Sequence, residues 1–71
     1  MDNRQPAAEQ AYQAIRTRIV SGALRSGERL VEQSLAEDLG LSRTPVRTAI
    51  TRLITEGFAE RSEGYSTRVA Q

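Results

Sequence analysis

The chain has 71 residues, which allows one small domain over residues 1–71 and leaves little room for a deep cleft. Its 38% hydrophobic and 27% charged residues are typical of a globular domain with a modest core. It contains neither cysteine nor histidine, which excludes disulfide bonds, Cys/His metal sites, a thiol nucleophile and an imidazole base. We therefore expect no enzyme, no metal and no cofactor. No apolar run is long enough for a membrane span or a signal peptide, so we expect a cytoplasmic protein.

The net charge of +1 at pH 7 says little about the partner, but the kind of cation is informative. All ten cationic residues are arginine, which suits bidentate contact with phosphate and with the edge of guanine. Codon bias in a GC-rich genome would explain this preference equally well.

A first helix is predicted directly after Pro6, a residue that suits the first helical position. Tyr12, Ile15 and Ile19 recur on one face, and Gly22 ends the helix in a left-handed conformation. The following stretch, 21–30, contains two glycines and two serines and is predicted to be a loop.

A second helix is predicted from the apolar stripe of Val31, Leu35 and Leu39. Glu32 lies in its first turn, where the helix dipole favours an anion, and Gly40 ends it.

A third helix is predicted to begin with Thr44 as its N-cap and Pro45 as its first residue, because proline forces the preceding residue out of the α region. We expect it to run to about Glu56 and to end at Gly57. Its apolar face consists of Val46, Ala49, Ile50, Leu53 and Ile54, and its polar face of Arg47, Thr48, Thr51, Arg52 and Thr55.

Two further segments are predicted to be extended. Residues 28–30 form a short extended piece, and residues 58–69 form a tight hairpin in which the glycine of Glu63-Gly64 supplies a positive φ.

The connection at residues 40–42 is so short that the second and third helices must cross steeply, which predicts a helix-turn-helix over about residues 32–51. Ala36 is small at the expected crossing, Leu41 fills the corner and Val46 faces back across it. An ordinary corner in a small helical domain would favour the same residues.

From Leu39 to Thr55 the chain carries Arg43, Arg47 and Arg52 but no carboxylate, which predicts a basic face. The first turn of the third helix would also favour phosphate through its exposed N–H groups and dipole, and such a helix can enter a major groove with that end first. For Arg47 the alternative is a solvated surface arginine, and Arg52 is expected to touch phosphate or nothing.

The sequence resembles the winged helix-turn-helix module of the GntR family of bacterial transcription regulators over about residues 9–70. The motifs that carry this resemblance are G-E-R-L at 27–30, L-A at 35–36, S-R-T-P-V-R at 42–47, R-L at 52–53 and E-G at 56–57. The form S-R-T-P-V-R is most similar to the FadR-like branch, whose members carry a C-terminal helical effector-binding domain.

The resemblance implies a mainly α fold with a small β-sheet, in which residues 28–30 are a short third strand and the hairpin at 58–69 is the wing. It implies that the recognition helix, residues 45–56, enters the major groove and that the wing tip enters the minor groove. The implied DNA-binding residues are Gln33, Ser42, Arg43, Thr44, Arg47, Thr48, Arg52, Gly64 and Tyr65.

Their implied roles differ. Arg43 and Arg47 would read base edges, and Ser42 and Thr44 would hold phosphates. Gly64 would let the wing backbone approach the groove.

Three positions depart from the pattern of relatives. Gln33 stands where relatives carry a DNA-contacting arginine, and Thr48 where many carry glutamate. The tip has Glu63 and Tyr65 instead of a basic pair, so we expect the wing to bind weakly.

These expectations describe a sequence-specific double-stranded DNA-binding domain at the N-terminus of a metabolite-responsive regulator. Its partner would be a palindromic operator, and a homodimer would form only with the missing C-terminal domain. The alternative is a winged-helix module that docks on another protein without binding nucleic acid. The sequence leaves open the operator, the effector, and whether the protein is a repressor or an activator.

Overall fold

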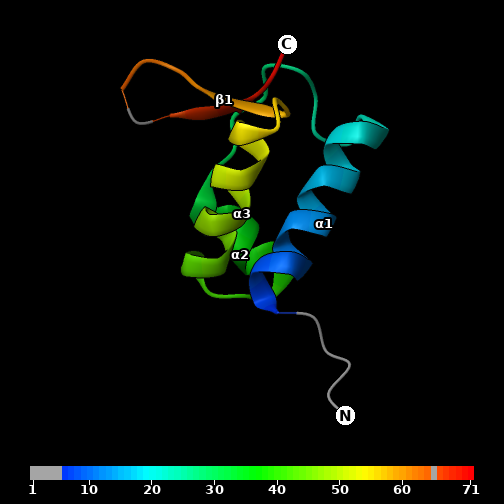
Figure 1. Cartoon of the computed structure of the whole chain (residues 1–71), viewed down its shortest axis with the longest axis vertical. Coiled ribbons are helices and arrows are strands. Elements are labelled where there is room, and N and C mark those ends of the chain that lie inside the picture. Colours follow the sequence, from blue (N-terminus) through cyan, green and yellow to red (C-terminus); the bar gives the residue numbers. More distant parts are fainter. Residues whose placement is uncertain (1–5, 65) are drawn as a thin grey trace.

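Three helices and then an antiparallel hairpin follow one another in the computed structural model, which describes residues 6–64 and 66–71 (Figure 1). The elements are α1 (Ala7–Ser21), α2 (Glu32–Leu39), α3 (Arg43–Thr55), β1 (Ala59–Arg61) and β2 (Thr67–Val69). The predicted mainly α fold with a small sheet is confirmed. None of the helices in the described part of the chain is long and apolar enough to cross a membrane.

The core lies mainly between α1 and α3, which run alongside one another in Figure 1. Ile15 of α1 and both Val46 and Leu53 of α3 are fully buried. Burial of each such side chain contributes about 1.5–3 kcal/mol. The helical spacing predicted the apolar faces of α1 and α3 well. The buried residues of α1 include Tyr12 and Ile15, and those of α3 are Val46, Ala49, Ile50 and Leu53, while the predicted Ile19 and Ile54 are only partly buried against the core.

The turn between α2 and α3 is closed by hydrogen bonds to the last turn of α2. Gly40 has a φ of +69°, and its N–H donates to the carbonyl of Glu37 at 3.3 Å. The N–H of Leu41 donates to the carbonyl of Ala36 at 2.9 Å, which completes a Schellman motif. Ala36 is only 4% exposed and Leu41 packs against the core. The predicted glycine corner is confirmed, and it redirects the chain into α3.

The start of α3 differs from the prediction by two residues. Ser42 is extended, with φ −77° and ψ 170°, and acts as the N-cap, so that Thr44 and Pro45 lie inside the first turn. The prediction was wrong because proline is tolerated throughout this turn, where the N–H groups have no intrahelical partner to lose. The end of α3 agrees with the prediction within one residue, because Thr55 is the last helical residue and Gly57 has a φ of +86°.

The hairpin of β1, residues 62–66 and β2, called the wing below, projects to one side of the helices (Figure 1). Its register pairs Ala59 with Val69 and Arg61 with Thr67. Gly64 has the predicted positive φ, +74°. Tyr65 lies outside the described residues.

The predicted third strand at 28–30 is reduced to a single antiparallel bridge between Arg29 and Arg68. The N–H of Leu30 still donates to the carbonyl of Thr67 at 2.8 Å, and that of Val69 to the carbonyl of Glu28 at 2.8 Å. Leu30 itself belongs to the buried core. The segment is too short for a strand, but it fixes the wing against the turn that leads into α2.

Candidate nucleic-acid interface

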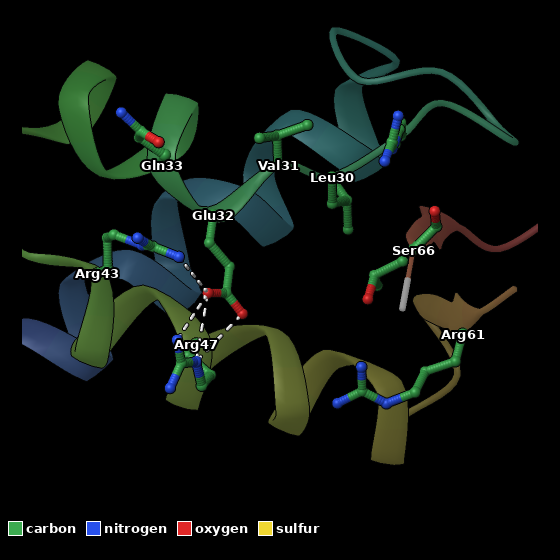
Figure 2. A pocket seen from close by; sticks show the side chains of 10 residues that line it. Leu30, Val31, Glu32, Gln33, Arg43, Arg47, Arg61 and Ser66 are labelled. Carbon is green, nitrogen blue, oxygen red and sulfur yellow. Dashed lines mark hydrogen bonds and ion pairs between the residues drawn. The ribbon is translucent and has the colours of Figure 1, made fainter. Parts of the chain in front are cut away.

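An open groove with a volume of about 500 Å³ lies between the start of α2, the start of α3 and the wing (Figure 2). We call it the arginine groove. Its charged and amide side chains are Arg29, Glu32, Gln33, Arg43, Arg47 and Arg61. Four guanidinium groups against one carboxylate make it a basic surface, and its arginines come from three separate parts of the fold.

Arg43 and Arg47 lie one turn apart on α3, so they share one face of the helix. Their side chains are 59% and 61% exposed. The structure therefore brings the two predicted base-reading residues together at the beginning of α3 and leaves both open to solvent.

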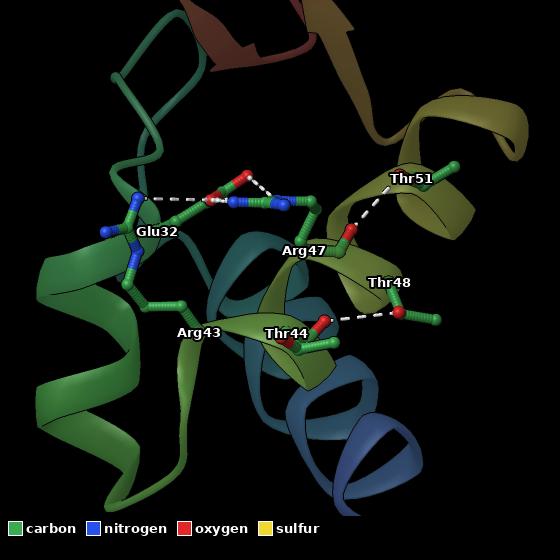
Figure 3. Close-up of polar contacts among 6 residues, drawn as sticks. All are labelled: Glu32, Arg43, Thr44, Arg47, Thr48 and Thr51. Atoms are coloured by element: carbon green, nitrogen blue, oxygen red, sulfur yellow. Dashed lines mark hydrogen bonds and ion pairs between the residues drawn. The ribbon is translucent and has the colours of Figure 1, made fainter.

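Both arginines nevertheless pair with Glu32 of α2 (Figure 3). Arg47 donates from Nε to both carboxylate oxygens at 3.2 and 3.3 Å and from Nη2 to Oε1 at 3.2 Å. Nη2 of Arg43 lies 3.9 Å from the same oxygen. The expectation that this basic face carries no carboxylate is therefore wrong, because Glu32 reaches it from a different helix.

Sequence reasoning assigned Glu32 only to the dipole of its own helix and missed this pairing. The residue does lie at the first position of α2. The crossing of α2 and α3, however, also carries it over the start of α3, fifteen residues further along the chain. The predicted steep crossing was the signal that could have indicated this contact.

The threonines on the exposed face of α3 use their hydroxyl groups locally. Thr48 donates to the carbonyl of Thr44 at 3.1 Å, and Thr51 to that of Arg47 at 3.0 Å (Figure 3). Such bonds to the preceding turn occupy the hydroxyl proton but leave the oxygen able to accept. Ser42 is exposed and makes no side-chain bond at the helix cap, and Gln33 is exposed beside Glu32.

Arg52 is not part of the groove. It pairs with Glu9 of α1 at 3.0 Å and with Glu56 at 3.4 Å, and its guanidinium carbon lies 3.7 Å from the centroid of the Tyr12 ring. The side chain of Arg52, predicted to contact phosphate, thus lies between α1 and α3, where it binds partners that the sequence analysis did not consider.

The same cluster perturbs four ionisable groups. For Arg52, desolvation lowers the pKa, but the hydrogen bonds to Glu9 and Glu56 outweigh it and raise the pKa. The hydroxyl of Tyr12 donates to Glu56, which raises the pKa of Tyr12 and lowers that of Glu56. Hydrogen bonds from Gln13 and Arg52 lower the pKa of Glu9.

Besides Glu32, two arginines of the groove were absent from the predicted site. Arg61 is exposed on β1 and reaches into the groove from the wing side (Figure 2), and Arg29 is exposed just before Leu30. Arg29 belongs to the G-E-R-L motif, which could have drawn attention to it. The position of Arg61 depends on how the wing is docked, which no local pattern predicts.

Gly64 is exposed at the wing tip, with its neighbour Tyr65 outside the described residues. Across residues 6–64 and 66–71, no three acidic side chains are grouped in a way that could hold a metal ion.

Comparison with known proteins finds relatives that are named as regulatory proteins. The chain is 37% identical over 71 residues to the Glc operon transcriptional activator of Escherichia coli strain K12, covering 99% of this chain and 28% of that protein. It is 39% identical over 66 residues to the probable rhizopine catabolism regulatory protein MocR of Rhizobium meliloti, covering 92% and 13%. The chain therefore spans less than a third of these relatives.

Solved structures of transcription regulators have the same fold as this chain. A transcriptional regulator of the GntR family from Pseudomonas syringae pv. tomato str. DC3000 superposes with a TM-score of 0.83 and 33% identity, over 97% of this chain and 31% of that one. The DNA-binding domain of AraR, in complex with operator ORR3, superposes with a TM-score of 0.84 and 27% identity, over 99% and 86%. The family described as bacterial regulatory proteins, gntR family, matches residues 7–69, and the chain accordingly belongs to the GntR family.

Proposed function

We propose that this chain is the sequence-specific DNA-binding domain of a bacterial transcription regulator. The start of α3 enters the major groove of double-stranded DNA, and the wing tip lies in the adjacent minor groove. The observation that carries the proposal is the arginine groove, in which Arg43, Arg47 and Arg61 converge from α3 and the wing. The likeness to AraR, whose DNA-binding domain was crystallised in complex with its operator, supports binding to DNA.

The roles of the side chains follow from their placement. Arg43 and Arg47 read base edges, since arginine binds O6 and N7 of guanine in a bidentate manner. Ser42 and Thr44, both exposed at the first turn of α3, hold phosphates together with the free N–H groups of that turn.

The remaining contacts are peripheral. Gln33 and Thr48 lie exposed beside the two arginines and contact bases or phosphates at the edge of the site, and Arg61 neutralises a phosphate. Gly64 and Tyr65 form the wing contact.

Arg52 is the exception among the predicted contacts. Its partners Glu9, Glu56 and Tyr12 would have to release it before it could meet a phosphate. We propose that Arg52 supports the position of α3 on α1 instead.

The chain is further proposed to be the N-terminal part of a longer cytoplasmic protein without catalytic activity. Its C-terminal part would bind a small metabolite and form the homodimer, so the operator would be palindromic. The form of residues 42–47 favours the FadR-like branch of the family.

The proposal is tested by selecting duplexes from a random pool with the chain fused to a dimerising partner. We expect enrichment of a palindromic consensus, and an affinity that falls as salt rises because phosphate binding releases counterions. The double variant Arg43→Ala/Arg47→Ala, carried through the same selection, is the matched control and should enrich nothing. Two results together would favour protein docking instead. The unfused wild-type chain would bind no duplex at low salt, and the DNA affinity of the fused chain would not change with salt concentration.

A further inference from the structure

Glu32 is the sole carboxylate among the groove residues that the structure describes. Its side chain is 30% exposed, while those of its partners Arg43 and Arg47 are about twice as exposed. An acidic group is unexpected here, because it opposes the attraction of DNA phosphates for the same two arginines. Its position therefore calls for a role other than phosphate binding.

The hydrogen bonds of Arg47 show which part of the guanidinium group Glu32 occupies. The carboxylate binds Nε and Nη2, which form one side of the planar group. No residue of the described chain is bonded to Nη1. The outer edge, formed by Nη1 and the second proton of Nη2, thus stays free, and this is the pair of donors that a guanine can accept in a bidentate contact. Glu32 fixes the plane of Arg47 without covering its base-reading edge.

The charges have a second consequence. Two guanidinium groups and one carboxylate leave this end of α3 with a single net positive charge. Phosphate attraction responds to net charge, whereas guanine recognition responds to the direction of the donors. An acid in this position therefore weakens binding to non-specific duplexes more than it weakens binding to the specific operator.

We propose that Glu32 is a specificity-determining positioning residue. It orients Arg47, and through charge Arg43, toward base edges, and it suppresses non-specific binding to the DNA backbone. This inference rests on the proposed function, because it assigns a further residue to the same DNA-binding site.

The test compares three variants in the dimerised form used for selection, each measured on the selected duplex and on a scrambled duplex over a series of salt concentrations. Glu32→Gln keeps the length and one acceptor oxygen but removes the charge. Glu32→Asp keeps the charge but is too short to reach both nitrogens of Arg47. Glu37→Gln removes the same charge from the far end of α2, outside the groove, and is the matched control.

For Glu32→Gln we expect affinity for the scrambled duplex to rise several-fold, and the slope of log affinity against log salt to steepen by about 0.9 per domain. The ratio of specific to non-specific affinity should fall by about tenfold, which is within the range of one bidentate arginine–guanine contact. Glu32→Asp should leave the scrambled duplex bound as in the wild type while weakening the selected duplex. Glu37→Gln should leave the ratio unchanged.

The outcomes separate this inference from the proposed function. A wild-type protein that prefers no duplex would contradict the proposed function itself. A wild type that does select, together with Glu32→Gln and Glu37→Gln variants that keep equal ratios, would overturn only the role of Glu32. Nitrogen-15 NMR of the Arg47 Nε–H in the unbound chain gives a readout without DNA. Its exchange with water should be slow in the wild type and fast in Glu32→Ala, and equal exchange in both would also overturn the proposal.

Discussion

The guanidinium carbon of Arg52 lies 3.7 Å from the centre of the Tyr12 ring, and this contact joins α3 to α1. The hydroxyl of the same tyrosine donates to Glu56, and Glu9 completes the cluster from α1. Cation–π contacts at exposed sites contribute modestly to stability, and here two carboxylates also hold the guanidinium group over the ring. The cluster therefore adds polar contacts to the apolar packing that holds α3 against α1.

Arg52→Ala is expected to lower the melting temperature clearly and to lower the affinity for DNA only slightly. The substitution removes two ion pairs and the contact with Tyr12. Thermal unfolding followed by circular dichroism would measure the first effect, and titration of a fluorescent duplex the second. Arg16→Ala is a suitable control, since Arg16 stacks more distantly, 5.0 Å from the ring centre of Phe58. A loss of affinity on every duplex at unchanged melting temperature would instead identify Arg52 as a phosphate contact.

The pH dependence of stability should reflect Glu56. Its pKa is lowered from the ordinary value of 4.5, first by the hydrogen bond from Tyr12 and then by Arg52. A folded-state pKa below the unfolded one means that the ionised form favours folding, so the contribution is complete well above pH 4.5 and is lost as the pH falls through the folded-state value. The gap in unfolding free energy between the wild type and Glu56→Gln should therefore be constant near neutral pH and narrow below 4.5. Urea unfolding at a series of pH values measures it, and a gap that does not narrow on acidification would contradict this assignment.

The crossing of α2 and α3 should not tolerate a larger side chain. Ala36 is 4% exposed at the turn between the helices, so Ala36→Leu is expected to destabilise the fold by about 1–3 kcal/mol through overpacking. Ser34→Leu, at an exposed position of the same helix, should have little effect. Urea unfolding of both variants provides the comparison, and equal stability of the two would mean that the crossing has room to spare.

Sequence patterns predicted the parts of this structure that depend on neighbours along the chain. The apolar spacing of Tyr12, Ile15 and Ile19 located α1, and Gly40 located the corner, because helix periodicity and a left-handed glycine are local properties. The cap of α3 was misplaced because the first turn accepts Pro45 at more than one position.

The site was predicted less completely than the fold, for a related reason. Arg43 and Arg47 were identified because they follow one another on a single helix. Glu32, Arg29 and Arg61 were missed because only the docking of α2 and the wing against α3 brings them into one groove. Among the partners of Arg52, Glu9 was missed because it lies forty-three residues away, whereas Glu56 is a local i,i+4 partner that the sequence analysis did not consider.

The two arginines of α3 are expected to carry sequence preference. Arg43→Ala or Arg47→Ala should weaken binding to the selected duplex by about 1–3 kcal/mol and relax preference at the contacted base pair. Both side chains are exposed and contribute nothing to the core, so the melting temperature should stay close to that of the wild type. Competition between the selected duplex and single-base variants would measure the preference. Equal losses on all duplexes would assign these residues to phosphates.

Arg61 is expected to behave differently from Arg43 and Arg47, because it reaches the groove from the wing, at a distance from the base-reading end of α3. Arg61→Ala should weaken the selected and the scrambled duplex about equally, and it should make the slope of log affinity against log salt shallower by about 0.9 per domain. Arg25→Ala is the matched control, since Arg25 is an exposed arginine outside the groove and should leave the slope unchanged. If Arg61→Ala reduced affinity for the selected duplex alone, the wing strand would be reading sequence through base edges, and the division of roles between α3 and the wing would have to be redrawn.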